Sequence, residues 1–354
     1  MMSLPLYVSL LAGWMVLALT ALLATGASSL SRGVLAFVLL GLCGAGHIPV
    51  ADAAQALMAL CPALALCVET CRGGGGGRSG WKALRPFILS GNASLALALG
   101  RCDLLGVFIG ISLVVRLAGA WGPRGPGRDG WRLLRATLGG LILAQGGLFV
   151  LRAGWGPMPG QAGAVLLVGG LLMACGLLSP PAAGQPEGNM NGLMVLPIIA
   201  RAAGSWPQLT PVLTFFGGVC LLWSLPPRPG GASRSLNWSG WAVMAAGLPA
   251  GQAALPLAAC LLMLACPPPV GQAPQNGGRV TPWPPFLPGM ALVLVLVAEM
   301  RASLPVALLA GVSLWPFLAG GGQVQVTVRG QGGLLLALGC MVLAIVAYRG
   351  MVQP

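Results

Sequence analysis

Long apolar runs alternate with short polar segments along the whole chain. Each run is about 15 to 20 residues long, the length of a helix that crosses a bilayer. They lie near 4–24, 34–48, 54–70, 86–100, 104–121, 133–151, 162–178, 190–205, 208–225, 286–300, 302–319 and 332–349. The run 237–267 is too long for one span, and Leu248-Pro249 near its middle predicts a hairpin of two helices. The pattern therefore predicts about fourteen transmembrane helices.

The composition supports an all-α polytopic membrane protein. Of the 354 residues, 56% are hydrophobic and only 7% are charged, whereas a soluble domain has about 25% charged residues. The ten-residue alternation that barrel strands require is not found in the sequence. Helices remain, since lipid offers no hydrogen-bond partner to an open backbone.

Most of the basic residues lie at the ends of the apolar runs or between them. The formal charge of +13 comes from 19 basic and six acidic residues, with Lys82 the single lysine. Because the arginines lie mostly at the ends of runs, we interpret them as topology anchors and expect no nucleic-acid partner. Threading fourteen spans places thirteen basic residues on one side and four on the other, as the positive-inside rule predicts.

Metal and redox chemistry are not expected from this chain. Its ten cysteines include no C-x-x-C pair, and the spacing of Cys61, Cys67 and Cys71 does not fit zinc or an iron–sulfur cluster. The single histidine, His47, lies beside Pro49 at a helix end and is interpreted as interfacial. We predict no metal, no bound cofactor and no catalytic residue.

Paired prolines suggest internal symmetry. Ser179-Pro180-Pro181 interrupts one run and Trp283-Pro284-Pro285 precedes another, each within a group of five spans. Five is odd, so the two groups would have opposite orientations, an arrangement found in ion translocators with broken helices. The alternative is that the prolines only end helices and that the symmetry follows from the chosen boundaries.

The expected organisation has four parts. They are an N-terminal three-helix segment with a Gly/Arg loop, two inverted five-helix repeats, and a C-terminal helix. Their ranges are 1–85, 86–207, 208–320 and 321–354.

Four stretches of the chain carry a family resemblance. They are DLLGVFIGISLVVRLAGAW, AGAVLLVGGLLMACGLLSPPAAGQPEG, LMVLPIIARAAGSW and PPFLPGMALVLVLVAEM. In this order they resemble the fifth helix, the broken seventh, the eighth and the broken twelfth helix of the antiporter-like membrane subunits of respiratory complex I. Within this family the chain is most similar to the subunit 2 branch of NADH:ubiquinone oxidoreductase. The order and spacing of the stretches carry the resemblance.

The resemblance implies proton translocation by a row of buried ionisable groups, in which this chain departs from the family. The glutamate of helix five falls on Ser112, and the lysines of helices seven and twelve fall near Ala174 and Met290. The lysine of helix eight is replaced by Arg201, which cannot titrate. Arg116, one helical turn after Ser112, and Glu299 are the remaining candidates for a proton path.

Each candidate has an alternative interpretation. Arg201 is either a central cation or an anchor near Trp206, and Arg116 is either functional or an anchor near Trp121. Glu299 either joins the path or forms an interfacial pair with Arg301.

The resemblance implies a membrane-arm subunit that contributes to proton translocation or supports it structurally. NADH, FMN, iron–sulfur clusters and ubiquinone would belong to partner subunits, and lipids such as cardiolipin would surround the chain. We expect the mitochondrial inner membrane, with a bacterial plasma membrane as the alternative. The competing functions are a stand-alone secondary transporter built on inverted repeats, and a structural subunit of complex I that has lost conduction.

Overall fold

The computed structural model describes residues 58, 61–62, 64–66, 81–122, 125–178, 188–225, 232–265 and 287–314. The expected spans near 4–24, 34–48 and 332–349 lie outside this part of the chain, as do most of 54–70, residues 71–80, His47 and both proline pairs.

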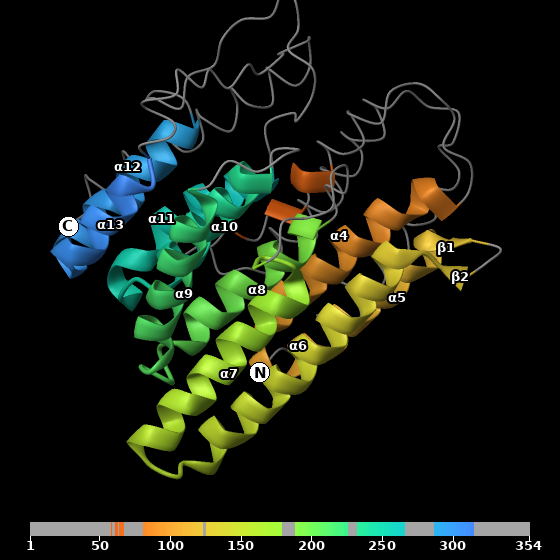
Figure 1. Cartoon of the computed structure of the whole chain (residues 1–354), viewed down its shortest axis with the longest axis horizontal. Coiled ribbons are helices and arrows are strands. Elements are labelled where there is room, and N and C mark those ends of the chain that lie inside the picture. Colours follow the sequence, from red (N-terminus) through yellow and green to blue (C-terminus); the bar gives the residue numbers. More distant parts are fainter. Residues whose placement is uncertain are drawn as a thin grey trace, which may run out of the picture.

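Apart from the connections between elements, the described residues form helices and one small hairpin (Figure 1). The elements are α4 (Trp81–Leu99), η1 (Cys102–Leu104), α5 (Leu105–Ala120), β1 (Trp121–Gly122), β2 (Gly125–Pro126), α6 (Arg128–Ala153), α7 (Pro157–Cys175), α8 (Gly188–Ala202), α9 (Leu209–Ser224), α10 (Ala232–Ala246), α11 (Ala250–Ala265), α12 (Leu287–Ala302) and α13 (Leu304–Val312). The strands are antiparallel, and Trp121 pairs with Pro126.

The predicted hairpin in the run 237–267 is confirmed. Helices α10 and α11 are joined at Gly247–Pro249, where proline cannot continue the first helix. The expected span near 133–151 lies within α6, but the helix begins five residues earlier, at Arg128. Arginine is a good helix former, so the helix continues through its basic turn beyond the apolar segment.

Two helices are long and apolar enough on their own to cross a membrane, namely Gly130–Ala153 and Pro157–Cys175. Shorter apolar helices span Met190–Ala202, Leu209–Ser224 and Gln252–Ala265. The total of fourteen spans and the inverted repeats stay predictions.

Helices α6 and α7 form an antiparallel pair with unusually close backbones. A Cβ atom added to Gly147 would lie 2.5 Å from the carbonyl oxygen of Gly163, and one added to Gly140 would lie 2.5 Å from that of Gly170. In each helix the two glycines are seven residues apart, which places them on one face. In lipid the hydrophobic effect does not favour contact between helices, so their association depends on van der Waals packing. Small residues at the contact allow the two backbones to pack closely.

Helix α7 ends in a Schellman motif. Gly176 has φ 72°, which a residue without a side chain adopts without strain, and the Leu177 amide donates to the Leu172 carbonyl at 2.9 Å. The helix therefore ends at Cys175, before the proline pair that the sequence analysis marked as the interruption.

Helix α8 lies at the centre of the described bundle. It contacts α4, α5, α7, α9, α10 and α11, and Figure 1 shows it between the α4–α5 edge and the α12–α13 edge. Leu193, Met194, Leu196 and Ile199 are fully buried. The last described helix of the first predicted repeat thus packs against helices of the second.

The outward faces of the peripheral helices are apolar. Large exposed hydrophobic side chains include Val107 and Val114 on α5, Ile142 on α6, Phe215 on α9 and Leu308 on α13. A bundle with an apolar core and an apolar outer face is suited to lipid or to neighbouring subunits.

Arginine residues lie at both ends of the bundle. Arg101, Arg152, Arg201 and Arg301 lie at one end, which we call the Arg101 end. At the other, the Arg128 end, exposed Arg128, Arg132 and Arg135 extend the first turns of α6. For all of these residues except Arg201, which falls inside a predicted span, the placement agrees with the side given by threading the spans.

Candidate functional site

Ser112 forms a buried polar contact between α4 and α5. It is the eighth of sixteen residues in α5, and it is only 2% exposed. The Asn92 side-chain amide donates to Ser112 Oγ at 3.0 Å and to the Phe108 carbonyl at 2.8 Å. Both side chains are neutral, so the pair can exchange hydrogen bonds with water but cannot itself store or release a proton.

Arg116 follows one turn later on the same inward face of α5. Its side chain is 8% exposed, and its Nε is buried without a hydrogen-bond partner. The groups that act on it electrostatically are Arg85 on α4, a like charge, and Cys175 on α7. No carboxylate among the described residues lies within ion-pair distance, so this guanidinium is an uncompensated charge within the described helices.

Arg201 lies at the opposite end of the bundle. It is the penultimate residue of α8 and is exposed, and its Nη1 takes up the space that a Cβ atom on Gly100 would need; φ of Gly100 is 60°. Any side chain at position 100 would collide with the guanidinium. The interface-anchor interpretation of Arg201 fits this location, and its membership of a proton path stays a prediction.

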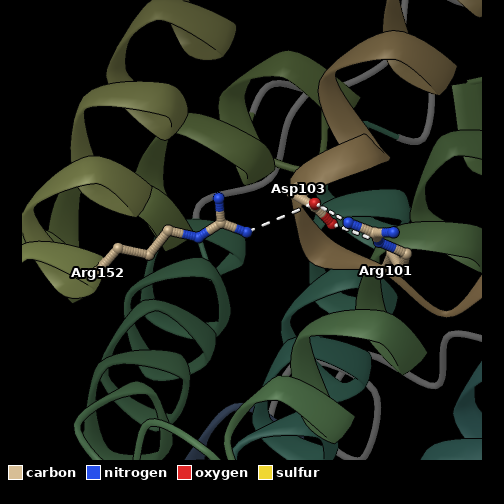
Figure 2. A network of polar contacts seen from close by, with 3 residues as sticks. All are labelled: Arg101, Asp103 and Arg152. Carbon is tan, nitrogen blue, oxygen red and sulfur yellow. Dashed lines mark hydrogen bonds and ion pairs between the residues drawn. The ribbon is translucent and has the colours of Figure 1, made fainter. Parts of the chain in front are cut away.

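Beside Gly100, three side chains form an ion cluster (Figure 2). Two come from the connection between α4 and α5, and the third comes from the last turn of α6. Arg101 binds Asp103 in a bidentate manner, with Nε to Oδ1 at 3.1 Å and Nη2 to Oδ2 at 2.6 Å. Arg152 Nη2, at the end of α6, lies 3.5 Å from Oδ2 of the same carboxylate. The cluster joins the α4–α5 connection to the end of α6.

The cluster shifts the ionisation of its members. The hydrogen bond from Arg101 holds the pKa of Asp103 below its usual value, and the same bond raises the pKa of Arg101. Burial, followed by the negative charge of Asp103, raises the pKa of the adjacent Cys102 thiol to about 11, while Arg152 acts in the opposite direction. The thiol is therefore protonated at neutral pH.

The position of Arg101 and Arg152 at the ends of apolar runs predicted anchors only, and the ion cluster was not predicted. Two signals could have revealed it: Arg101 and Asp103 are two residues apart, and threading the spans puts Arg152 on the same side.

Glu299 is buried near the end of α12, at the Arg101 end. Its Oε1 has no hydrogen-bond partner, whereas Arg301 two residues later is exposed. The expected Glu299–Arg301 pair is therefore not formed. Residues two apart on a helix point to different faces, so only an irregular end could have joined them.

The four predicted path residues do not converge. Ser112 and Arg116 share one face of α5, whereas Arg201 and Glu299 lie at the other end of the bundle. Along α5, Arg116 is eleven residues from Leu105, about 16 Å at the helical rise. Among the described residues, no three of His, Cys, Asp and Glu come together as metal ligands.

Comparison with known proteins identifies the fold. No protein-family model and no curated protein sequence matches the chain. A chain in the structure of the Mrp complex from Dietzia sp. DQ12-45-1b has a TM-score of 0.66 at 14% identity, over 99% of this chain and 51% of that one. Our chain thus spans about half the length of that relative.

A second solved structure is similar over its whole length. A chain of respiratory complex I from Thermus thermophilus with bound Aureothin has a TM-score of 0.61 at 16% identity, covering 97% of this chain and 98% of that one. At these identities the likeness shows a shared fold. The chain has the architecture of subunits of these multi-subunit complexes, and its apolar outer faces fit a membrane protein.

Proposed function

We propose that this chain is an antiporter-like membrane-arm subunit of respiratory complex I, of the subunit 2 type, in the mitochondrial inner membrane. The observation that carries the proposal is the fold match that extends over 97% of this chain and 98% of a complex I chain. The sequence resemblance, in helix order and length, points to the same subunits. NADH, FMN, iron–sulfur clusters and ubiquinone would be bound by partner subunits.

Within that assembly, we propose that the chain supports proton translocation through fixed charge and ordered polar groups. Position 112 carries a serine bonded to Asn92, and one turn away Arg116 provides a permanent buried positive charge. Neither group changes protonation near neutral pH. Their effect on a proton would be electrostatic, through the field that a buried charge exerts in a medium of low dielectric constant.

Two alternatives come from other classes. The fold shared with a chain of the Mrp complex favours a transport subunit outside the respiratory chain. A structural subunit of complex I that has lost conduction is favoured by the neutral Asn92–Ser112 contact. The first alternative differs in its partners, and the second differs in proton flux.

The test is to isolate the full-length tagged chain from its own membranes in mild detergent and separate it by native electrophoresis. The proposal requires co-migration with a large assembly that oxidises NADH, with an unrelated tagged membrane protein as the control. A small oligomer without NADH oxidation contradicts it. If the assembly forms, Arg116→Met, with Arg301→Met as matched control, should lower the protons moved per NADH oxidised; an unchanged ratio favours the structural subunit.

A further inference from the structure

The ion cluster at the Arg101 end has more positive charge than it neutralises internally. Two guanidinium groups, those of Arg101 and Arg152, share one carboxylate, that of Asp103, so the net formal charge of the cluster is +1. Arg101 and Arg152 have side chains that are 63% and 55% exposed. Each guanidinium has five N–H donors. Asp103 accepts hydrogen bonds from two of those on Arg101 and forms an ion pair with Arg152.

The carboxylate also arranges the two arginines. Asp103 lies between Arg101 and Arg152, so the carboxylate holds one guanidinium group on each side of it (Figure 2), and both arginine side chains stay more than half exposed. A guanidinium fork matches the oxygens of a phosphate in a bidentate manner. Such ordering reduces the side-chain entropy that is lost on binding.

An apolar surface begins directly below these arginines. Phe149 precedes Arg152 by three residues on α6 and forms an edge-to-face contact with Trp155, with ring centroids 5.9 Å apart. Both rings are largely exposed. Ile142, which is 73% exposed, lies ten residues before Arg152, about 15 Å along the helix. That distance matches one leaflet of a hydrocarbon core about 30 Å thick.

We propose that this surface binds an anionic phospholipid, with its phosphate at Arg101 and Arg152 and its acyl chains along the outer face of α6. The arginines, the tryptophan and the apolar face of α6 follow one another along the bundle. A phospholipid has its phosphate, its interfacial region and its acyl chains in the same order. A soluble anion would use only the arginines, and an acidic protein would not need the exposed apolar face below them. The inference requires insertion in a membrane but not assembly into complex I.

The test measures lipid binding to the purified full-length chain in nanodiscs by native mass spectrometry. Dioleoyl phosphatidylglycerol should bind more tightly than dioleoyl phosphatidylcholine. The double variant Arg101→Gln/Arg152→Gln should weaken phosphatidylglycerol binding about 25-fold, since each surface arginine contributes about 1 kcal/mol, a factor of about five. Arg301→Gln, an exposed arginine of the same end outside the cluster, should leave it unchanged.

Several outcomes would overturn the proposal. These are equal affinity for the two lipids, an unchanged double variant, an equal loss in Arg301→Gln, displacement of the lipid by millimolar inorganic phosphate, or release of the lipid by an acidic protein partner. The double variant Arg101→Lys/Arg152→Lys is the control for folding, because it keeps both positive charges. It should melt at the same temperature as the wild type and retain part of the preference for phosphatidylglycerol. A chain that migrates alone but keeps the preference contradicts the proposed function and leaves this inference standing.

Discussion

Asn92 on α4 holds the middle of α5 through two hydrogen bonds from one amide nitrogen, to the Ser112 hydroxyl and to the Phe108 carbonyl. The carbonyl also belongs to the helical ladder of α5, so Asn92 binds the helix at its side chain and at its backbone together. In a lipid environment such a contact fixes the register of two helices that otherwise have only apolar faces to align them.

Replacing Asn92 should therefore weaken the α4–α5 contact. We expect Asn92→Ala to destabilise the purified chain by about 0.6 to 1.7 kcal/mol, the range for hydrogen bonds between membrane helices. A double-mutant cycle with Ser112→Ala, read by thermal melting in detergent, should show that the two losses are not additive. Strict additivity would mean that the bond contributes nothing to stability.

The fold should tolerate a carboxylate at position 112, because Arg116 lies four residues later and can serve as its counter-charge. In Ser112→Glu the new charge precedes a buried arginine at the favourable spacing and order. We expect this variant to melt above Ser112→Gln, its neutral match. Adding Arg116→Met to both should reverse the order, because the glutamate would then be buried without a counter-charge. An order that does not reverse would show that Arg116 does not face position 112.

Because α6 and α7 pack closely at their glycines, neighbouring positions on α6 should respond differently to substitution by alanine. Gly147→Ala places a methyl group against the α7 backbone and should cost about 1 to 3 kcal/mol. Gly146→Ala meets nothing within 4 Å and should be neutral or stabilising by up to about 1 kcal/mol, since alanine favours the helix. Thermal melting of both variants checks the difference. Equal effects would mean that the two helices are not packed this closely.

Cys102 should react slowly with thiol reagents despite lying in a connection between helices. With its pKa at about 11, only a small fraction is thiolate at pH 8. Asp103→Asn removes a negative charge that raises this pKa, so alkylation at pH 8 should become faster. The measurement is the maleimide labelling rate in a chain whose other cysteines are replaced by alanine or serine. A slower rate in Asp103→Asn would contradict the prediction.

Acid should remove the contribution of Asp103 to stability. Because its pKa is lower in the folded chain than the ordinary value of about 3.9, ionised Asp103 stabilises the fold above that value. The contribution is lost as the pH falls through the lowered pKa. The melting-temperature difference between wild type and Asp103→Asn should be constant from about pH 7 to pH 5 and shrink below about pH 4. If the melting-temperature difference instead changed between pH 5 and pH 7, the pH dependence would come from a group other than Asp103.

The sequence predicted the positions of the helices well and their contacts poorly. Apolar length located α5, α9 and α12 to within two residues, because hydrocarbon thickness sets the length of a span. It placed the start of α6 five residues late, since helices can continue past the apolar boundary. Chain direction put Arg101 and Arg152 at one end, although their shared carboxylate depends on side-chain geometry.

The candidate site shows the same limit. One-turn spacing correctly placed Arg116 on the face of Ser112, whereas nothing local to α5 indicated that Asn92, twenty residues earlier, would bond with it. Partners between helices depend on packing angles, which the apolar pattern leaves open. Glu299 and Arg301 are two residues apart in the sequence, yet one is buried and the other exposed, because helical rotation separates them.

The enclosure of α8 has a consequence for how the protein is made. Its contacts with α10 and α11 cannot be completed until Ala265 has been synthesised, 63 residues after α8 ends at Ala202 (265 − 202 = 63). Until then, the side of α8 that later faces α10 and α11 lacks the contacts of these two helices. The bundle therefore closes around α8 late, and truncation before Ala265 should leave an intermediate with one face of its central helix uncovered.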